Sequence, residues 1–157
     1  MTGSLAGRVV LVTGSSRGIG AEVAVKAAAE GATVAVHFRN GADAATRTLE
    51  RVRAHGGEGE TFAADIAVGS EAEGLVRQVI ERFGRIDGLV NNAGRTLVGP
   101  FLETEPAAWD EVIATDLSAA FHTSRAALPS MVERGSASPA TGAVSSRRAS
   151  RSIRGWS

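Results

Sequence analysis

One short apolar run and the glycines that follow it constrain the fold of this chain most strongly. Residues 8–13 read Arg-Val-Val-Leu-Val-Thr, a β-branched segment typical of a strand that is buried on both faces. A glycine-rich turn over residues 14–20 follows at once. A helical pattern then covers residues 18–30, and Gly31 is well placed to end it. The apolar positions that carry this helical period are Ile19, Val23 and Ala27.

The same alternation of strand and helix continues along the chain. Three more strands are predicted at residues 33–38, 60–65 and 86–90. Helical patterns cover residues 42–54, 71–83 and about 106–131. We expect the last helix to cover one face of the sheet through an apolar stripe of Trp109, Val112, Ile113, Leu117, Phe121 and Leu128. The pattern predicts an α/β protein with a Rossmann-type, doubly wound parallel sheet, truncated after about four or five strands.

Composition excludes several functional classes. The chain carries 17 basic and 17 acidic residues, so no charge imbalance favours a nucleic-acid or membrane partner. It has no cysteine, and its three histidines lie far apart, so we expect no metal site. The first residues lack a basic stretch followed by a long apolar core, and we therefore expect a cytoplasmic protein.

Two glycine-containing motifs are predicted to meet at one edge of the sheet. Glycines at a strand-to-helix turn let a pyrophosphate approach unpaired backbone N–H groups. Taken alone, the turn at residues 14–20 is equally compatible with a structural role and no ligand. Asn91-Asn92-Ala93-Gly94 follows the fourth predicted strand directly, at the same carboxyl edge. Open α/β sheets bind ligands at that edge, so the two motifs together predict a dinucleotide site.

Three motifs resemble those of the short-chain dehydrogenase/reductase family over roughly residues 5–134. They are Thr-Gly-Ser-Ser-Arg-Gly-Ile-Gly at 13–20, Asp65 after the third strand, and Asn-Asn-Ala-Gly at 91–94. The likeness is greatest to 3-oxoacyl-carrier-protein reductases and related sugar or steroid reductases. It implies an NAD(P)-dependent oxidoreductase that interconverts ketones and secondary alcohols, with a small carbonyl or alcohol substrate. The oligomeric state stays open.

The resemblance also implies which residues contact the cofactor. Residues of the first turn would hold the pyrophosphate and the adenosine ribose: Gly14, Ser15, Ser16, Arg17, Gly18, Ile19 and Gly20. Asp65 and Ile66 would border the adenine, and Asn92, Ala93 and Gly94 would line the ribose on the nicotinamide side. A structural alternative is that Asn91 and Asn92 tie neighbouring strands together.

The end of the second predicted strand bears on the choice between NADP and NAD. A carboxylate there would bind the ribose 2′-hydroxyl of NAD, but the chain has Phe38 followed by Arg39. Arg39 and Arg17 could clamp a 2′-phosphate, because guanidinium groups match phosphate oxygens. We therefore expect a preference for NADP. The alternative is that both arginines are ordinary solvated surface groups.

The catalytic half of the family pattern is missing. In that family a tyrosine transfers the proton and a lysine four residues later lowers its pKa, but this chain has no tyrosine and its only lysine is Lys26. Asp116 stands where the family carries a helix asparagine, and the change removes an amide donor. No catalytic residue is therefore assigned. A non-catalytic dinucleotide-binding or interaction protein is the competing hypothesis.

The predicted organisation is a Rossmann domain over residues 1–134 and an atypical tail over residues 135–157. The tail holds seven serines and four arginines and no acidic residue. The composition of this tail is typical of a disordered segment. One hypothesis is that the chain is a frameshifted or prematurely ended gene product. Another is that it is a fragment with a different function. Gly142-Ala143-Val144 weakly resembles a fifth strand, with Ser146 at its end. Translation of the coding DNA in the other frames tests the frameshift hypothesis.

Overall fold

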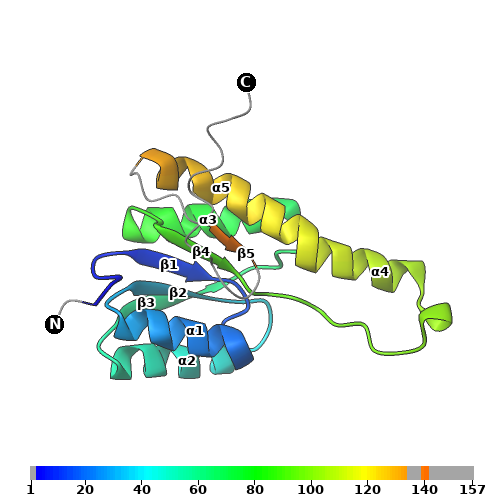
Figure 1. Cartoon of the computed structure of the whole chain (residues 1–157), viewed down its shortest axis with the longest axis horizontal. Helices are drawn as coiled ribbons and strands as arrows, with labels where there is room; N and C mark the ends of the chain where they lie inside the picture. Colours follow the sequence, from blue (N-terminus) through cyan, green and yellow to red (C-terminus); the bar gives the residue numbers. More distant parts are fainter. Residues whose placement is uncertain (1–2, 134–138, 142–157) are drawn as a thin grey trace.

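The computed structural model describes residues 3–133 and 139–141. Five parallel strands form one sheet in the order β3-β2-β1-β4-β5 (Figure 1). The strands are β1 (Val9–Val12), β2 (Thr33–Phe38), β3 (Glu58–Ala63), β4 (Gly88–Asn91) and β5 (Pro139–Thr141). This arrangement confirms the predicted Rossmann-type parallel sheet.

The helices between the strands cover both faces of the sheet. They are α1 (Gly18–Ala29), α2 (Ala42–Ala54), α3 (Gly69–Phe83), α4 (Pro106–Val112) and α5 (Ala119–Glu133). A short 3₁₀ turn, η1 (Phe101–Glu103), precedes α4, and a π-helical stretch, η2 (Ile113–Ser118), joins α4 to α5. Figure 1 shows α1 and α2 on one face of the sheet and α3 and α5 on the other.

Strand β1 is buried on both faces, as its unbroken apolar run predicts. Val9 and Leu11 belong to the core beneath α3 and α5, while Val10 and Val12 belong to the core beneath α1 and α2. Successive side chains of a strand point to opposite faces, so a central strand needs apolar residues at every position.

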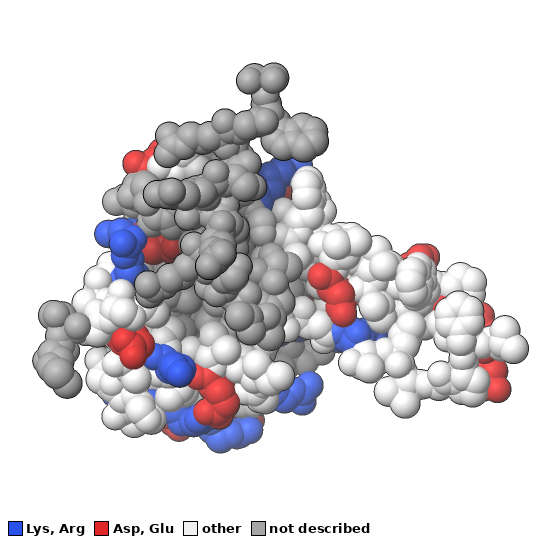
Figure 2. Space-filling model, viewed as in Figure 1, with Lys and Arg blue, Asp and Glu red and all other residues white. Residues whose placement is uncertain are grey.

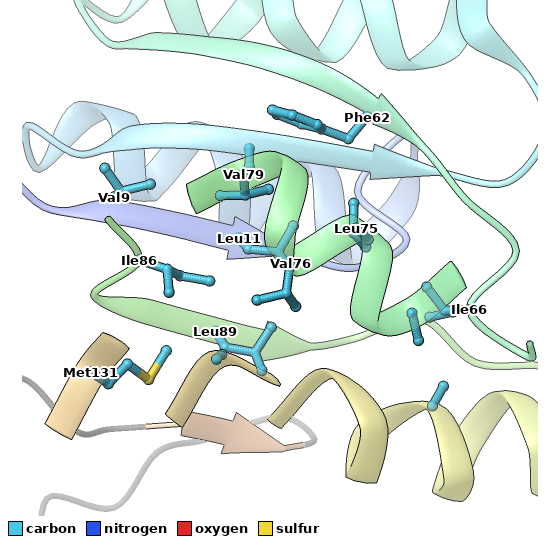
Figure 3. Packing of buried hydrophobic residues seen from close by; sticks show 14 residues of the cluster. Val9, Leu11, Phe62, Ile66, Leu75, Val76, Val79, Ile86, Leu89 and Met131 are labelled. Carbon is cyan, nitrogen blue, oxygen red and sulfur yellow. The ribbon is translucent and has the colours of Figure 1, made fainter. Parts of the chain in front are cut away.

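The core beneath α3 is packed mainly by aliphatic side chains (Figure 3). Leu75, Val76 and Val79 descend from α3 toward the sheet, and all three are fully buried. Leu11 lies in the middle of this layer, and Met131 reaches it from α5.

Helix α1 approaches the sheet through a different face from the one that its larger side chains suggest. Its buried positions are Gly20, Ala21, Ala24, Val25, Ala27 and Ala28. The helix predicted over residues 18–30 is confirmed: Ala27 is buried and Val23 packs half-buried against the core, while Ile19 is 73% exposed. Small side chains allow a closer helix–sheet approach, which explains why the alanine face packs inward.

The predicted inward stripe on the last helix was wrong. Trp109, Leu117 and Phe121 are exposed, and Val112, Ile113 and Leu128 are only half-buried. Helix α5 instead buries Ala119, Thr123, Ala127 and Met131. One cause is the π-helical stretch, whose extra residue shifts the phase of the helix. Another is that α4 and the segment before it extend beyond the sheet (Figure 1).

Residues 96–112, which we call the arm, carry much exposed apolar surface. Val98, Phe101 and Leu102 are each more than four-fifths exposed, and Trp109 is about half exposed. Figure 2 shows the arm as a mostly uncharged projection from the body of the molecule. Among the described residues, no helix is both long and apolar enough to cross a bilayer.

The fifth strand begins three residues before the predicted one. Pro139–Thr141 pairs in parallel with Leu89–Asn91 of β4. The expectations for Gly142–Val144, for Ser146 and for most of the tail at 135–157 lie outside the described residues.

A buried carboxylate fastens the start of β1 to the segment before β4. The Asp87 side chain is 2% exposed and accepts a hydrogen bond from the Val9 N–H at 2.9 Å. Arg85 also donates to it, and Arg8 lies 3.5 Å away. Burial alone would raise the pKa of Asp87, but the hydrogen bonds from Arg85 and Val9 and the charges of Arg85 and Arg8 together outweigh it and hold this pKa below its usual value.

Replacing this carboxylate should destabilise the whole sheet. Asp87→Ala leaves the buried Val9 N–H without its acceptor, and we expect a loss of about 2–3 kcal/mol in the free energy of unfolding. Urea denaturation measures it. The matched control is Asp110→Ala on the exposed surface of α4, expected to stay within about 0.5 kcal/mol. Equal losses in both variants would contradict this role of Asp87.

Candidate dinucleotide-binding site

Hydrogen bonds of Thr13 and Asn92 fasten the glycine-rich turn after β1 to the end of β4. Thr13 Oγ1 accepts hydrogen bonds from the N–H groups of Asn92 and Ala93, both at 3.0 Å, and donates to the Val90 carbonyl at 3.3 Å. The Asn92 amide donates in return to the carbonyls of Thr13 at 2.9 Å and Gly14 at 3.3 Å. The two predicted motifs therefore form one hydrogen-bonded unit.

The neighbouring asparagine connects β4 to α5. Asn91 Nδ2 donates to Ser124 Oγ at 3.1 Å, and Asn91 Oδ1 accepts a hydrogen bond from Thr123 Oγ1 at 2.7 Å. The structural alternative named neighbouring strands, but Asn91 joins β4 to the helix α5, and Asn92 joins the loop after β4 to the turn after β1. Asn92 in addition lines the cavity described below.

Two glycines of the turn are required by close packing. Gly14 has a φ of +64°, and a Cβ there would lie 2.8 Å from Ala93 Cα. A Cβ on Gly20 would lie 2.4 Å from Asn92 Nδ2 and 2.6 Å from the Gly14 carbonyl oxygen. Gly18 differs, because its φ is +59° and no atom lies within 4 Å of a Cβ placed there. The backbone at Gly18 is therefore open to an approaching ligand.

The backbone N–H groups of the turn fall into two sets. Gly14 donates to His37 Nδ1 and Ser15 donates to the His37 carbonyl, both at 2.9 Å. Across the described part of the chain, the N–H groups of residues 16–20 donate to no acceptor. Arg17, at the N-cap of α1, forms no side-chain cap. These free donors and the positive end of the helix dipole together suit a phosphate group.

A cavity of about 520 Å³ opens at this edge of the sheet. Its volume lies within the range of about 300–1,000 Å³ that is typical of small-molecule sites. The predicted residues on its wall are Gly14, Ser16, Arg17, Ile19, Gly20, Arg39, Asp65, Ile66, Asn92, Ala93 and Gly94. The structure therefore brings together segments that follow β1, β2, β3 and β4.

Two predicted residues lie off the wall of this cavity. Ser15 is fully buried beneath the turn, where its hydroxyl donates to the Val12 carbonyl at 2.7 Å and accepts from the His37 N–H at 3.0 Å. Gly18 borders a neighbouring groove along α1.

The sequence-based prediction missed several residues of the wall, namely His37, Phe38, Asn40 and Thr115. His37 could have been found from its place at the carboxyl end of the second predicted strand. Thr115 could not, because it reaches the cavity from the π-helical stretch.

Charged side chains stand at the part of the cavity that follows β2 and β3. Arg39 Nη1 lies 3.7 Å from Asp65 Oδ2, and both side chains are partly exposed. Arg17 makes no ion pair with any described residue. An exposed ion pair contributes at most about 1 kcal/mol, so Arg39 can exchange its partner at little cost.

Asp116, the departure from the family pattern, anchors the loop after β4. Its Oδ1 accepts a hydrogen bond from the Arg95 N–H at 2.8 Å, and a Cβ on Gly94 would lie 3.5 Å from it. The Arg95 guanidinium forms an ion pair with Glu111 of α4. Backbone and side chain of Arg95 thus connect the loop to the long helix. No group of three or more metal-ligating side chains is found in residues 3–133 and 139–141.

Comparison with known proteins decides the family. Residues 8–150 match the sequence model described as short chain dehydrogenase. The chain belongs to the short-chain dehydrogenase family. It is 37% identical over 124 residues to the 3-oxoacyl-[acyl-carrier-protein] reductase FabG of Staphylococcus epidermidis, an alignment that covers 79% of this chain and 51% of that protein.

Solved structures of short-chain dehydrogenases share the fold. A dehydrogenase/reductase from Sinorhizobium meliloti 1021 is 38% identical, with a TM-score of 0.79 over 82% of this chain and 51% of that one. A blue fluorescent protein from a metagenomic library, solved in complex with NADPH, is 35% identical, with a TM-score of 0.76 over 81% and 52%. The chain spans about half the length of the relatives that it matches.

A methyl group at Gly20 should disrupt the contact between the turn and Asn92. Gly20→Ala overpacks this junction, and we expect a loss of about 1–3 kcal/mol in the free energy of unfolding. Gly74→Ala on α3 is the matched control, because its nearest neighbour would be the flexible Arg77 side chain at 3.6 Å. That control should be neutral or stabilising by about 0.5–1 kcal/mol. Equal stability of the two variants in chemical denaturation would rule out the tight junction.

Proposed function

We propose that this chain binds NADP in the cavity at the carboxyl edge of its sheet. The observation that carries the proposal is the set of free N–H groups at residues 16–20, which lie at an uncapped helix N-terminus across from Asn92–Gly94. Backbone donors in this arrangement fit a pyrophosphate, and Gly14, Ser16, Arg17 and Gly20 of the same turn line the cavity.

The remaining walls fit the other parts of a dinucleotide. We infer that Asp65 and Ile66 border the adenine, and that Asn92, Ala93 and Gly94 line the ribose next to the nicotinamide. Ile66 supplies a buried apolar surface suited to a flat base, and the loop of Ala93 is held rigidly by Thr13. A bound NADP supplies a hydride acceptor or donor. We therefore assign this chain to the cofactor-binding part of an enzyme that interconverts ketones and secondary alcohols.

The charges around the cavity support NADP over NAD. No carboxylate stands at the end of β2, where Phe38 precedes Arg39. Arg17 and Arg39 both line the cavity and can donate charge-assisted hydrogen bonds to a 2′-phosphate. Such bonds contribute about 1.5–3 kcal/mol each, more than the exposed pair between Arg39 and Asp65 that must be exchanged.

A non-catalytic, dinucleotide-binding role is the second candidate, and one specific observation favours it. The sequence has no tyrosine, and its one lysine, Lys26, is exposed on α1. The tyrosine and lysine pair that the family resemblance implies for proton transfer is therefore absent from these 157 residues. We propose that this chain binds the cofactor without reducing a ketone by itself.

Calorimetric titration with NADP⁺ and NAD⁺ tests the assignment. We expect NADP⁺ to bind at least about tenfold more tightly than NAD⁺, and Arg39→Ala to weaken NADP⁺ binding about tenfold, which corresponds to about 1.4 kcal/mol. NAD⁺ binding should stay unchanged in that variant, because NAD⁺ has no 2′-phosphate. Arg77→Ala, an exposed arginine on α3, is the matched control. Equal affinities for the two dinucleotides, or no effect of Arg39→Ala, would refute the NADP preference.

A further inference from the structure

One buried histidine lies against the turn that is proposed to bind phosphate. His37 is on β2, next to the last residue of that strand, and is 2% exposed. It lies between the turn after β1 and the segment that follows β3, and it forms part of the cavity wall. The proposed function of the cavity assigns no role to this side chain.

The hydrogen bonds of His37 hold both the turn and the segment after β3. Its Nδ1 lies 2.9 Å from the Gly14 nitrogen, and its Nε2 lies 3.1 Å from the Ala64 carbonyl oxygen. The Gly14 N–H can only donate, so Nδ1 must carry a lone pair, and the Ala64 carbonyl can only accept, so Nε2 must carry the hydrogen. These two partners fix the imidazole as one neutral tautomer.

The surroundings of His37 also favour this neutral form. Burial lowers the pKa of His37, and the hydrogen bond to Ala64 and the charge of Asp65 offset the effect only in part. The charged groups around the same cavity are Arg17 on the turn, Arg39 after β2, Asp65 after β3 and Arg95 after β4. As the pH falls below about 6.5, the unfolded chain takes up this proton before the folded chain does, so the folded state loses stability there.

We propose that neutral His37 is a positioning residue for the dinucleotide site, and that its protonation releases the turn and weakens dinucleotide binding in acid. This inference rests on the proposed function of the cavity. A proton on Nδ1 would turn the acceptor of the Gly14 N–H into a donor, so two donors would face each other across 2.9 Å. The turn must then move. The free N–H groups of residues 16–20 follow Gly14 directly and would lose their alignment.

The test compares how steeply NADP⁺ affinity falls between about pH 8 and about pH 5.5 in the wild type, His37→Asn and His55→Asn. The 2′-phosphate of NADP⁺ titrates near pH 6 whichever protein is used. Differences in pH dependence between the proteins therefore report the protonation of His37. His37→Asn offers a side-chain oxygen to the Gly14 N–H but has no titrating group. We expect the affinity of the wild type to fall about fivefold more than that of His37→Asn. His55 is an exposed histidine after α2 and serves as the control. The NADP⁺ affinity of His55→Asn should fall as much as that of the wild type.

A second measurement needs no cofactor. In ¹⁵N NMR spectra of the free wild-type protein, the Gly14 amide signal should move with the same midpoint as the His37 ring signals. The His37 proposal is overturned if that amide does not titrate, or if wild type and His37→Asn show the same pH dependence of binding. Absence of NADP⁺ binding by the wild type at about pH 8 would instead refute the proposed function. The two failures are therefore distinguishable.

Discussion

The fold and the site both depend on the hydrogen bonds of one threonine at the junction of β1 and β4. Thr13 Oγ1 accepts hydrogen bonds from two backbone N–H groups of the loop after β4, and the Asn92 side chain donates two hydrogen bonds to carbonyls of the turn after β1. The pairing of β1 with β4 brings these two loops to one edge, and this junction joins them directly. Gly14 then lies so close to Ala93 that no other residue fits without movement. The cavity is the space left beside this rigid unit.

The turn is held from a second side by β2, and this decides which of its backbone groups remain available. His37 engages the amides of Gly14 and Ser15, so the turn is fixed at its start. The donors at residues 16–20 stay free because α1 begins there without a side-chain cap. An unpaired helix N-terminus on a fixed support presents backbone donors that suit a phosphate group.

Much of this arrangement could be predicted from the sequence, because central strands and glycine turns leave strong local signals. The run at residues 8–13 has to be apolar throughout when both faces are covered, and β1 shows this. The inward face of the last helix was predicted wrongly, since a π-helical turn and a projection beyond the sheet change which side chains are buried. The contact of His37 with Gly14 was also missed. It joins residues 23 positions apart, and it depends on the register of two strands, which the local pattern does not encode.

We propose that a dinucleotide binds between the turn after β1 and the loop after β4. Backbone amide shifts in ¹⁵N NMR spectra, followed during titration with NADP⁺, test this binding. We expect saturable shifts concentrated at residues 16–20 and at Asn92, Ala93 and Gly94, with α3 amides unaffected. Saturation without shifts at these two segments, or shifts confined to the arm at residues 96–112, would contradict it.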